Sequence, residues 1–523
     1  MSQKFKSEVI LTTGRSVTLY LNDGGIVQSL EKYYIFLNKE LCKETDSTVI
    51  SIYDLTPDTK YDFVIEDKDS NILSSGTFKT EREFVTINVK DLGAYGDGVH
   101  DDTAYIQAAI MACPKEGRVL IPEGEYLITS IFLTSDIRVE LQKGATLKAD
   151  TRRETRVHFP GSLKTSDPKN DEYHLGTWEG DPYPMFAGIV SAINAENTIL
   201  YGEGIIDGCA SKENWWNDPK KMNVAYRPRM LFLNQCKNIK VQGVTLMNSP
   251  AWVIHPFFSD DLVFADLRVN NPKVSPNTDG LDPESCTNVE IVGVRFSLGD
   301  DCIAVKSGKI YMGAKYKKPS SNIHIYQCLM ENGHGAVTLG SEIAGGISDM
   351  KVEKCFFRHT DRGLRIKTRR GRGKQCRLNN ISFDNIIMDN VMSPFTANMF
   401  YFCDPDGHDE YVQSKEVYPV DERTPKLGEL KFTNIKATNA HVAAGYFSGL
   451  PESKIDSVIM ENVSVSFASD CESGVPIMSD SVTPMTRRGV FAENVKKLVL
   501  KNVKIEGFEG KEVETIGVDE VER

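Results

Sequence analysis

A short repeat of apolar residues, running from about residue 190 to the C-terminus, places the strongest constraint on how this chain can fold. Each copy begins with a polar residue and continues with spaced apolar positions, as in Asn238-Ile-Lys-Val-Gln-Gly-Val-Thr-Leu246. One copy forms a strand, a sharp turn and another strand, and it can bury its apolar side chains only against stacked copies. The repeat therefore predicts an all-β parallel β-helix, with further copies beginning at Asp261, Asn288, Asn322, Asp349, Asn380, Glu429, Ser457 and Lys497.

The same repeat predicts structural roles for two sets of residues. Cys328 and Cys355 occupy one position in successive copies, so we expect their thiols to stack in the interior rather than to bind a metal. Asparagine tolerates the left-handed backbone conformation of sharp turns, and asparagines that share a repeat position should form a ladder there. Four asparagines share such a position: Asn385, Asn434, Asn462 and Asn502.

Residues 1–84 lack the repeat and form a separate predicted domain, followed by the β-helix domain over residues 85–523. Their short runs of alternating apolar residues are separated by turn signals such as Asn22-Asp-Gly-Gly25, which indicates a β-sandwich. The stretch Leu55-Thr-Pro-Asp-Thr-Lys-Tyr61 and the strand Gly76-Thr-Phe-Lys-Thr80 resemble the tyrosine corner and last strand of fibronectin type III domains. This resemblance implies a fold and not an activity.

Two aspartates, Asp101 and Asp102, precede a helical apolar pattern that ends near Ile110. Aspartate and threonine at this point are typical of helix caps, so we interpret both aspartates as turn- and cap-forming rather than catalytic. The stretch from Leu92 to Ile110 resembles the first segment of pectate-lyase-like β-helices, in which a helix covers the open end of the coil.

Composition limits the partners and the compartment that we expect. A net charge of −12 disfavours non-specific binding to nucleic acid or anionic membranes, so neither is a predicted partner. No apolar stretch approaches the roughly 18 residues of a membrane span, and Val9–Leu11 is too short for a signal-peptide core. The 11 cysteines are scattered and odd in number, which is typical of reduced thiols. We therefore expect a cytoplasmic protein, unless a signal peptide was removed, and leave a homo-oligomer open.

The residues that carry chemistry fall on successive copies of the repeat. Aligning the second strands of four copies brings Asp279, Asp301, His334 and Arg362 into one column, with Asp300 beside Asp301. Adjacent coils lie about 4.8 Å apart, and carboxylates stacked at such a distance raise each other's proton affinity, from which folding gains nothing obvious. Glycoside hydrolysis needs this pairing, because one protonated carboxyl serves the leaving oxygen and an ionised one activates water. A solvated polar turn or a calcium site is the structural alternative.

Positive charge stands close to this column. Arg365 and Lys367 are two residues apart, so they share one face of a strand and can bind the carboxylate of an acidic sugar. The run that follows, up to Lys374, supplies local positive charge that the acidic chain otherwise lacks. We expect Arg369 and Arg370 in this run to bind substrate carboxylates at neighbouring subsites; a solvated charged face is the alternative.

Four short motifs resemble, in order and spacing, the signature of glycoside hydrolase family 28, the polygalacturonases. They are Asn277-Thr-Asp279-Gly, Gly299-Asp-Asp301, Gly333-His-Gly335 and Arg365-Ile-Lys367. The resemblance covers about residues 88 to 510. It implies a right-handed, pectin-lyase-like parallel β-helix and an inverting hydrolysis of galacturonan that uses no metal and no cofactor.

The resemblance also implies a role for each matching residue. Asp300 is the implied general acid, while Asp279 and Asp301 hold and deprotonate the attacking water. His334 supports the protonation of the acid, and the cations Arg365 and Lys367 bind the galacturonate carboxylate. We also place Asn277, from the first motif, and Asp282, two residues after it, among the substrate-binding residues.

Two further residues are predicted at substrate subsites. His255 falls in the column of Glu284, Lys306 and Lys367, one coil earlier, and an inert turn histidine is the equally weighted alternative. Tyr401 lies on a later strand and could contact the sugar ring.

The expected action is exo, with release of galacturonic acid from α-1,4-linked galacturonan or its oligomers. The first domain and the long gaps at 209–229, 309–319 and 389–428 could close one end of the groove, and the sequences around Asp279 and Lys367 resemble bacterial exo-polygalacturonases. An endo-polygalacturonase and a rhamnogalacturonan hydrolase are the alternatives within this chemistry. A calcium-dependent pectate lyase and a non-catalytic carbohydrate-binding β-helix are the rivals from other classes, although a binder has no need of stacked carboxylates.

Overall fold

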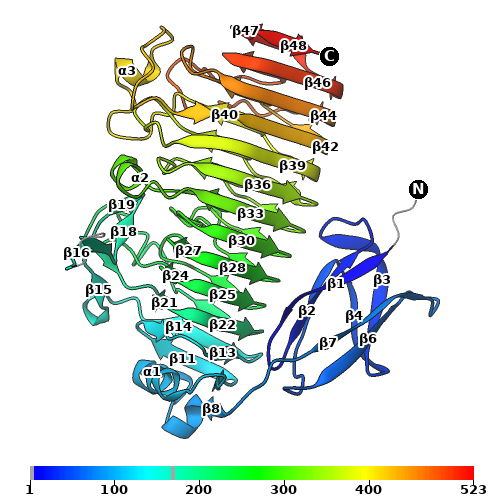
Figure 1. The fold of residues 1–523 in the computed structure, drawn as a ribbon, viewed down its shortest axis with the longest axis vertical. Coiled ribbons are helices and arrows are strands. Elements are labelled where there is room, and N and C mark those ends of the chain that lie inside the picture. The colour runs from blue at the N-terminus through cyan, green and yellow to red at the C-terminus, as the bar shows by residue number, and fades with distance from the viewer. Residues whose placement is uncertain (1–4, 167–170) are drawn as a thin grey trace.

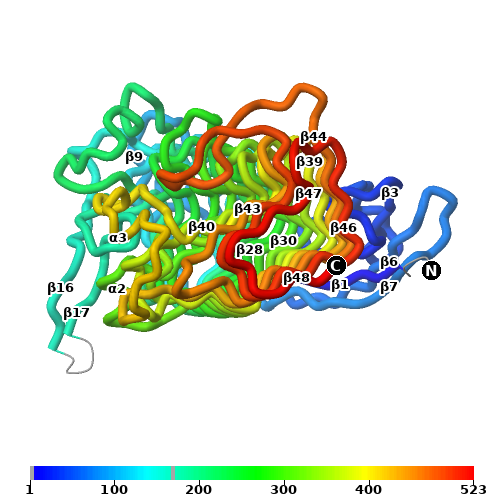
Figure 2. The backbone as a smooth tube through the Cα atoms, turned by 90° about the horizontal axis from the view of Figure 1, so that it is seen from above, coloured from blue at the N-terminus to red at the C-terminus, as the bar shows by residue number. Residues whose placement is uncertain are grey.

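In a computed structural model, which describes residues 5–166 and 171–523, the chain folds into a long parallel β-helix with a small β-domain at its side (Figure 1). The coils stack from α1 (Thr103–Ala112) at one end to β47 (Glu509–Ile516) and β48 (Glu520–Glu522) at the other. Viewed from the C-terminal end, successive coils lie over one another (Figure 2). None of the helices in the described part of the chain is long and apolar enough to span a membrane.

Three stacks of parallel strands form the helix wall, and each strand pairs with its equivalent one coil away. The first stack contains β10 (Arg118–Ile121), β13 (Arg138–Leu141), β22 (Glu196–Gly202), β25 (Lys237–Gln242), β28 (Asp260–Ala265), β30 (Thr287–Val292), β33 (Ser320–Tyr326), β36 (Ile347–Glu353), β39 (Arg377–Asp389), β42 (Glu429–Ala440), β44 (Ile455–Phe467), β46 (Val495–Glu506) and β48. The second contains β9 (Asp97–Asp101), β11 (Gly124–Ile128), β14 (Ala145–Ala149), β23 (Ile205–Asp207), β26 (Thr245–Met247), β29 (Arg268–Asn270), β31 (Arg295–Ser297), β34 (Leu329–Glu331) and β37 (Phe356–Arg358). The third contains β12 (Ile131–Leu133), β21 (Val190–Ile193), β24 (Leu231–Asn234), β27 (Ile254–Phe257), β32 (Ile303–Val305), β35 (Val337–Gly340), β38 (Arg362–Lys367), β40 (Ser393–Asn398), β43 (Ala443–Ser448), β45 (Arg488–Glu493) and β47.

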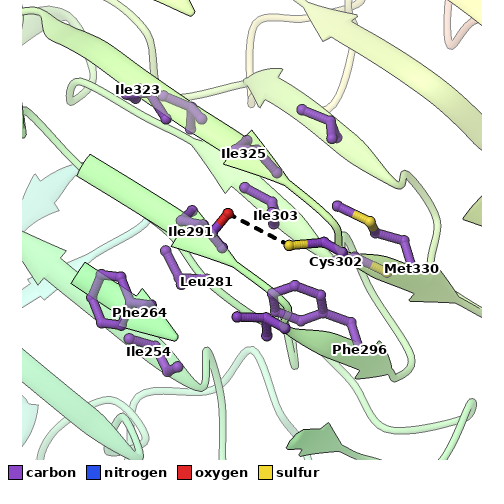
Figure 3. Packing of buried hydrophobic residues seen from close by; sticks show 14 of the residues in the cluster. Ile254, Phe264, Leu281, Ile291, Phe296, Cys302, Ile303, Ile323, Ile325 and Met330 are labelled. Carbon is purple, nitrogen blue, oxygen red and sulfur yellow. Dashed lines mark hydrogen bonds between the residues drawn. The ribbon is translucent and has the colours of Figure 1, made fainter. Parts of the chain in front are cut away.

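The repeat produces this wall because alternate side chains of each strand point inward and those between them point outward. Ile254, Leu281 and Ile303 from three successive coils of the third stack meet Phe264 and Ile291 of the first stack in the interior (Figure 3). All of these side chains are at most 1% exposed. One continuous apolar core therefore runs the length of the helix, and the predicted fold class is confirmed.

The structural roles predicted from the repeat are also confirmed. Cys328 and Cys355 are level on adjacent coils and fully buried. The four asparagines of the predicted ladder all have a φ of 51° to 54°. The side-chain amide of Asn462 donates to Asn434 at 3.1 Å, and that of Asn502 donates to Asn462 at 2.8 Å.

Asp101 and Asp102 form turns, as expected for the start of the coil. The Asp102 carboxylate accepts hydrogen bonds from the backbone N–H groups of Tyr95 and Gly96, at 2.6 and 2.8 Å. Asp101 accepts from the backbone N–H of Thr103 at 2.9 Å, at the first residue of α1.

The first domain consists of two antiparallel sheets around its own apolar core. One sheet contains β1 (Lys6–Thr12), β2 (Val17–Asn22) and β5 (Val49–Ile52); the other contains β4 (Glu40–Ser47), β3 (Gln28–Leu37), β6 (Lys60–Glu66) and β7 (Ile72–Lys79). The expected boundary at residue 84 lies between β7 and β8 (Thr86–Asn88), which pairs with the first coil.

The first domain also contacts the side of the helix. An apolar cluster joins Tyr20 and Val49 of this domain to Val292 and Tyr326 of the coils. Beside it, the Ser16 hydroxyl donates to Gln242 at 2.6 Å.

The insertions that hang on the coils gather on the side of the helix opposite to the first domain (Figure 1). They include α2 (Ile310–Tyr316), α3 (Glu410–Gln413) and short paired strands, which are β15 (His158–Phe159), β16 (Ser162–Lys164), β17 (Glu172–His174), β18 (Thr177–Trp178), β19 (Asp181–Pro182) and β20 (Met185–Phe186). These insertions surround the outer face of the third stack, where the predicted site residues lie.

Candidate active site

The register of the third stack determines which predicted residues lie side by side. Leu281, Ile303, Val337 and Leu364 are level on four successive coils and point inward. Asp279 is therefore level with Asp301, as predicted. The alignment is wrong by one residue in the third coil, because Gly335 rather than His334 is level with Asp301.

This one-residue shift places His334 beside Asp300 instead. The backbone N–H of His334 donates to the carbonyl of Asp300 at 3.1 Å. The turns on these three coils are equal in length, because Ile303, Val337 and Leu364 each follow their level residues Arg295, Leu329 and Phe356 by eight positions. The shift of His334 therefore reflects no inserted residue.

Three carboxylates converge on this face. One oxygen from each of Asp279, Asp300 and Asp301 lies within 4.8 Å of the other two. Asp301 is fully buried and Asp279 is nearly so, whereas Asp300 is only partly buried and borders the open cleft. The predicted cluster of aspartates is therefore present, with one member more accessible than the others.

Two cations hold Asp301. Lys367 Nζ lies 2.8 Å from one of its oxygens, and Arg365 Nη1 lies 3.1 Å from the other. Burial opposes ionisation of Asp301, but the charges of Lys367 and Arg365 outweigh it and hold the pKa of this carboxyl well below its usual range. Asp301 is therefore ionised throughout the ordinary pH range and can serve as a base.

Asp279 has the opposite environment. Burial and the negative charge of Asp300 raise the pKa of Asp279 to about 7, although Lys306 opposes the shift. Asp279 is therefore partly protonated near neutral pH. The site can thus hold a proton on Asp279 while Asp301 remains charged.

His334 completes the acidic side of the site. Its Nδ1 lies 2.8 Å from a carboxylate oxygen of Asp361, and its side chain is 53% exposed. The hydrogen bond to Asp361 raises the pKa of His334, and the nearby Asp300 adds to this effect against the cost of burial. Asp361 was not predicted from the sequence, where it is only an acidic residue preceding β38.

Asp279, Asp300, His334, Arg365 and Lys367 border a cleft of about 420 Å³, and Asp301 lies buried behind it. Asn277 and Tyr401 also line the cleft, so these two predicted substrate-binding residues are in reach of a ligand. Four insertions contribute Lys220, Lys309, Asp404 and Met478 to its walls, together with Pro219 and Cys403, and a fifth, which carries β18 and β19, contributes Glu179. The gaps at 209–229, 309–319 and 389–428 therefore do contribute residues to the site, as expected.

Lys306 is the most important residue that sequence reasoning missed. Its Nζ lies 3.1 Å from Glu342, 3.5 Å from Asp279 and 3.6 Å from Asp282, and 4.2 Å from the centre of the Trp252 ring. These carboxylates hold the pKa of Lys306 well above its usual range despite its burial. The signal was its position: Lys306 and Lys367 are level on the same face, two coils apart with Gly340 between them. Lys306 pairs with Asp279, and Lys367 pairs with Asp301.

The same carboxylates could in principle ligate a cation, because three oxygens converge. Lys367 and Arg365 already place positive charge against Asp301, and Lys306 does so against Asp279. Side chains thus supply the charge that a metal would otherwise provide.

Arg369 and Arg370 do not line the cleft, which corrects their prediction as direct substrate ligands. Arg369 pairs with Asp404 at 2.8 Å and Asp406 at 2.6 Å. Arg370 is 1% exposed and makes a bidentate pair with Glu452, at 2.6 and 2.9 Å. Their donors hold the 404–416 loop beside the site, so the basic run stabilises a wall rather than binding sugar.

His255 and Asp282 are also corrected as substrate-binding residues, because both are fully buried and neither lines the cleft. His255 Nε2 lies 2.9 Å from Glu284 Oε2, and burial holds the pKa of the imidazole well below its usual value. The predicted alignment of His255 with Glu284 is wrong, because Phe257 is level with Glu284 and His255 is level with Asp282. These two residues lie behind Lys306 and Trp252 rather than in front of them.

Comparison with known proteins agrees with this geometry. The sequence profile of Glycosyl hydrolases family 28 matches residues 121–481. A probable polygalacturonase from Vitis vinifera is 28% identical over 75% of this chain and 78% of its own length. An endo-polygalacturonase from Pectobacterium carotovorum subsp. carotovorum is 28% identical over 64% of this chain and 84% of its own length.

Two solved structures are similar in fold. A hyperthermoactive exopolygalacturonase from Thermotoga maritima superposes with a TM-score of 0.64 at 25% identity, covering 81% of this chain and 92% of that one. A family 28 exopolygalacturonase from Yersinia enterocolitica superposes with a TM-score of 0.71 at 19% identity, covering 99% and 98%. The expected right-handed, pectin-lyase-like β-helix is confirmed, and the chain belongs to glycosyl hydrolase family 28.

Proposed function

We propose that this family 28 glycoside hydrolase is an exo-polygalacturonase, which removes galacturonic acid from the end of α-1,4-linked galacturonan chains or oligomers. The observation that carries the proposal is the convergence of Asp279, Asp300 and Asp301 with Arg365 and Lys367 in one walled cleft. The carboxylates supply acid–base chemistry, and the two cations suit the carboxylate of a uronic acid.

In the proposed mechanism Asp300 is the general acid, because it is the most accessible of the three carboxyls and faces the cleft. As the acid, it donates a proton to the leaving glycosidic oxygen. Asp301, held ionised by Lys367 and Arg365, accepts a proton from the attacking water. Asp279 orients this water before it reacts. His334, whose backbone N–H donates to the Asp300 carbonyl, is assigned the supporting role for the acid that the family resemblance implies.

The stereochemical part of the proposal is inversion, implied by the family resemblance. The carboxylate oxygens lie within 4.8 Å, closer than the roughly 6.5–9.5 Å usual for inverting enzymes. Spacing alone therefore does not support inversion. NMR of the first-formed anomer tests it directly: inversion of an α-linkage releases β-galacturonic acid first, and an initial α-anomer contradicts it.

Exo-action is supported by the walls of the cleft. Residues from four separate insertions border it, including Lys220, Lys309, Asp404 and Met478. Two of these insertions are tied together, because His408 Nδ1 lies 2.8 Å from Asp480. A chain of galacturonate would have to pass these segments to bind across the site, whereas a chain end meets no such obstacle.

Trigalacturonate labelled at its reducing end tests the mode of action. Exo-action on the unlabelled end releases unlabelled monomer and labelled digalacturonate, and then repeats. Early release of unlabelled products longer than the monomer, from longer oligomers labelled in the same way, would instead show internal cleavage.

We also propose that the first domain has the fibronectin type III fold. Its sheets of three and four strands support this, as does the hydrogen bond that the backbone N–H of Thr56 donates to the Tyr61 hydroxyl at 2.9 Å.

A cytoplasmic location is a separate proposal, supported by the 11 cysteines, all of which are free thiols. Cell fractionation with a C-terminal tag tests it. Recovery of the protein outside the cell would contradict it.

A further inference from the structure

A second cavity, of about 400 Å³, lies between the first domain and the β-helix. Residues 26–28 of the first domain form one side, and the second-stack strands β29, β31, β34 and β37 form the other. The catalytic cleft lies on the third stack, and no residue lines both cavities. The first domain thus builds a separate site rather than a wall of the active site.

The helix side of this cavity is a column of outward-facing side chains. Arg268, Arg295, Leu329 and Phe356 are level on four successive coils. All four are partly buried, and all four line the cavity. The column therefore presents two positive charges followed by two apolar side chains.

Arg295 is the member whose charge is least compensated. Arg268 pairs with Asp266 at 3.1 Å, and Arg358 at the edge pairs with Glu331 through its Nε at 2.7 Å. Arg295 forms no ion pair with any residue that the structure describes; its one side-chain hydrogen bond there runs from Nη2 to the Ser47 hydroxyl at 3.3 Å.

This arrangement is unfavourable without an anion. Burial and the charge of Arg268 lower the pKa of Arg295, although Asp266, Asp46 and Glu331 oppose this from further away. Two guanidinium groups on adjacent coils repel each other, and folding gains nothing obvious from placing them together. A bound carboxylate between them would relieve the repulsion and use the guanidinium donors that remain.

We propose that this cavity is a non-catalytic binding site for a uronate-bearing segment of galacturonan. The identity of the ligand rests on the proposed function. The two arginines bind a carboxylate, and Leu329 with Phe356 contact the apolar face of a sugar ring, which an inorganic anion would not use. A polymer held here raises its own effective concentration at the cleft. The site therefore lowers KM for the polymer and leaves the hydrolysis of short oligomers unchanged, although it can bind them.

Binding is tested with trigalacturonate on the Asp300→Asn protein by titration calorimetry. We expect two equivalents bound per chain, one in the cleft and one in the cavity. Arg295→Gln should remove the second equivalent only, and so should Leu329→Glu, which sets a carboxylate beside the arginines. Arg377→Gln, at an exposed arginine on β39 outside this cavity, is the matched control and should retain both.

Kinetics give an independent readout in the otherwise unaltered enzyme. Arg295→Gln should raise KM for polygalacturonate by about fivefold and leave kcat/KM for digalacturonate and the melting temperature unchanged. A single bound equivalent that Arg295→Gln leaves in place, or two that survive both cavity variants, would overturn the proposal. Displacement of the second equivalent by an equal concentration of inorganic phosphate would overturn the assignment to sugar. If no trigalacturonate binds in the cleft while the second equivalent persists, the proposed function fails and this site stands.

Discussion

The catalytic column and the basic run after it concentrate charge in different ways, on neighbouring segments of one chain. Asp300, Arg365 and Lys367 line the cleft and keep part of their surface open to a ligand. Arg365 and Lys367 do so while both pair with Asp301. In the run, Arg369 and Arg370 are almost fully buried, and carboxylates of the 404–452 region match their charges. Both segments stand out in the sequence, so a concentration of charge identifies function only when an open surface remains.

The largest effect is expected at the acid of the column. Asp300→Asn keeps the size of the side chain but cannot donate the proton, so kcat should fall by about 10²–10⁴-fold. The melting temperature should change little, because Asp300 is partly exposed and makes no ion pair within the described residues. Steady-state kinetics on trigalacturonate and thermal unfolding measure the two quantities; a variant with wild-type kcat would remove Asp300 from the chemistry.

A different consequence is expected in the basic run. Arg370→Met leaves Glu452 buried and unpaired, so the free energy of unfolding should fall by about 3–5 kcal/mol. At a temperature where the variant is folded, its KM for trigalacturonate should equal that of the native enzyme. Arg377→Met, at an exposed arginine, is the control and should be neutral in denaturant unfolding. A raised KM without loss of stability would restore the interpretation of this run as a substrate subsite.

Lys306 joins the two patterns, because it is buried and yet borders the cleft. Lys306→Met should lower kcat by about 10–100-fold, the size expected for losing one hydrogen bond to a charged group of about 1.5–3 kcal/mol. It should also change the pH profile. Activity of the native enzyme should fall as pH rises through about 7, because Asp279 then loses its proton.

The direction of that change follows from the charge removed. Lys306 lowers the pKa of Asp279, so its loss should move the alkaline limb of the kcat profile to higher pH. If kcat falls while the alkaline limb of the pH profile stays in place, Lys306 acts through packing and not through its charge. The neutral variant Lys317→Met, at a lysine outside the cleft, should leave both quantities unchanged.

The smallest effect is expected from a chelator. Arg365, Lys367 and Lys306 supply the positive charge around the carboxylates, so excess EDTA should leave kcat within experimental error. Loss of activity that calcium restores would instead make the carboxylates a metal site.

Much of this architecture was predictable because the β-helix repeats its chemistry at every coil. Apolar spacing was sufficient for the stacks, for the Cys328–Cys355 contact and for the asparagine ladder, since these depend only on position within a coil. The register of single side chains was not predictable, because apolar spacing does not say which turn residues are level with one another, and His334 and His255 were misplaced for that reason. The partners of Arg370 and Lys306, such as Glu452 and Glu342, lie on distant or irregular segments that no local pattern links to them.

The account depends most on one claim, that the cleft hydrolyses galacturonan from a chain end. Product analysis of polygalacturonate digested with EDTA present, with the Asp300→Asn protein as control, tests it most directly. The account predicts early release of monomeric, saturated galacturonic acid by the native enzyme alone. A ladder of oligomers would contradict exo-action, and an unsaturated product absorbing in the ultraviolet would contradict hydrolysis itself.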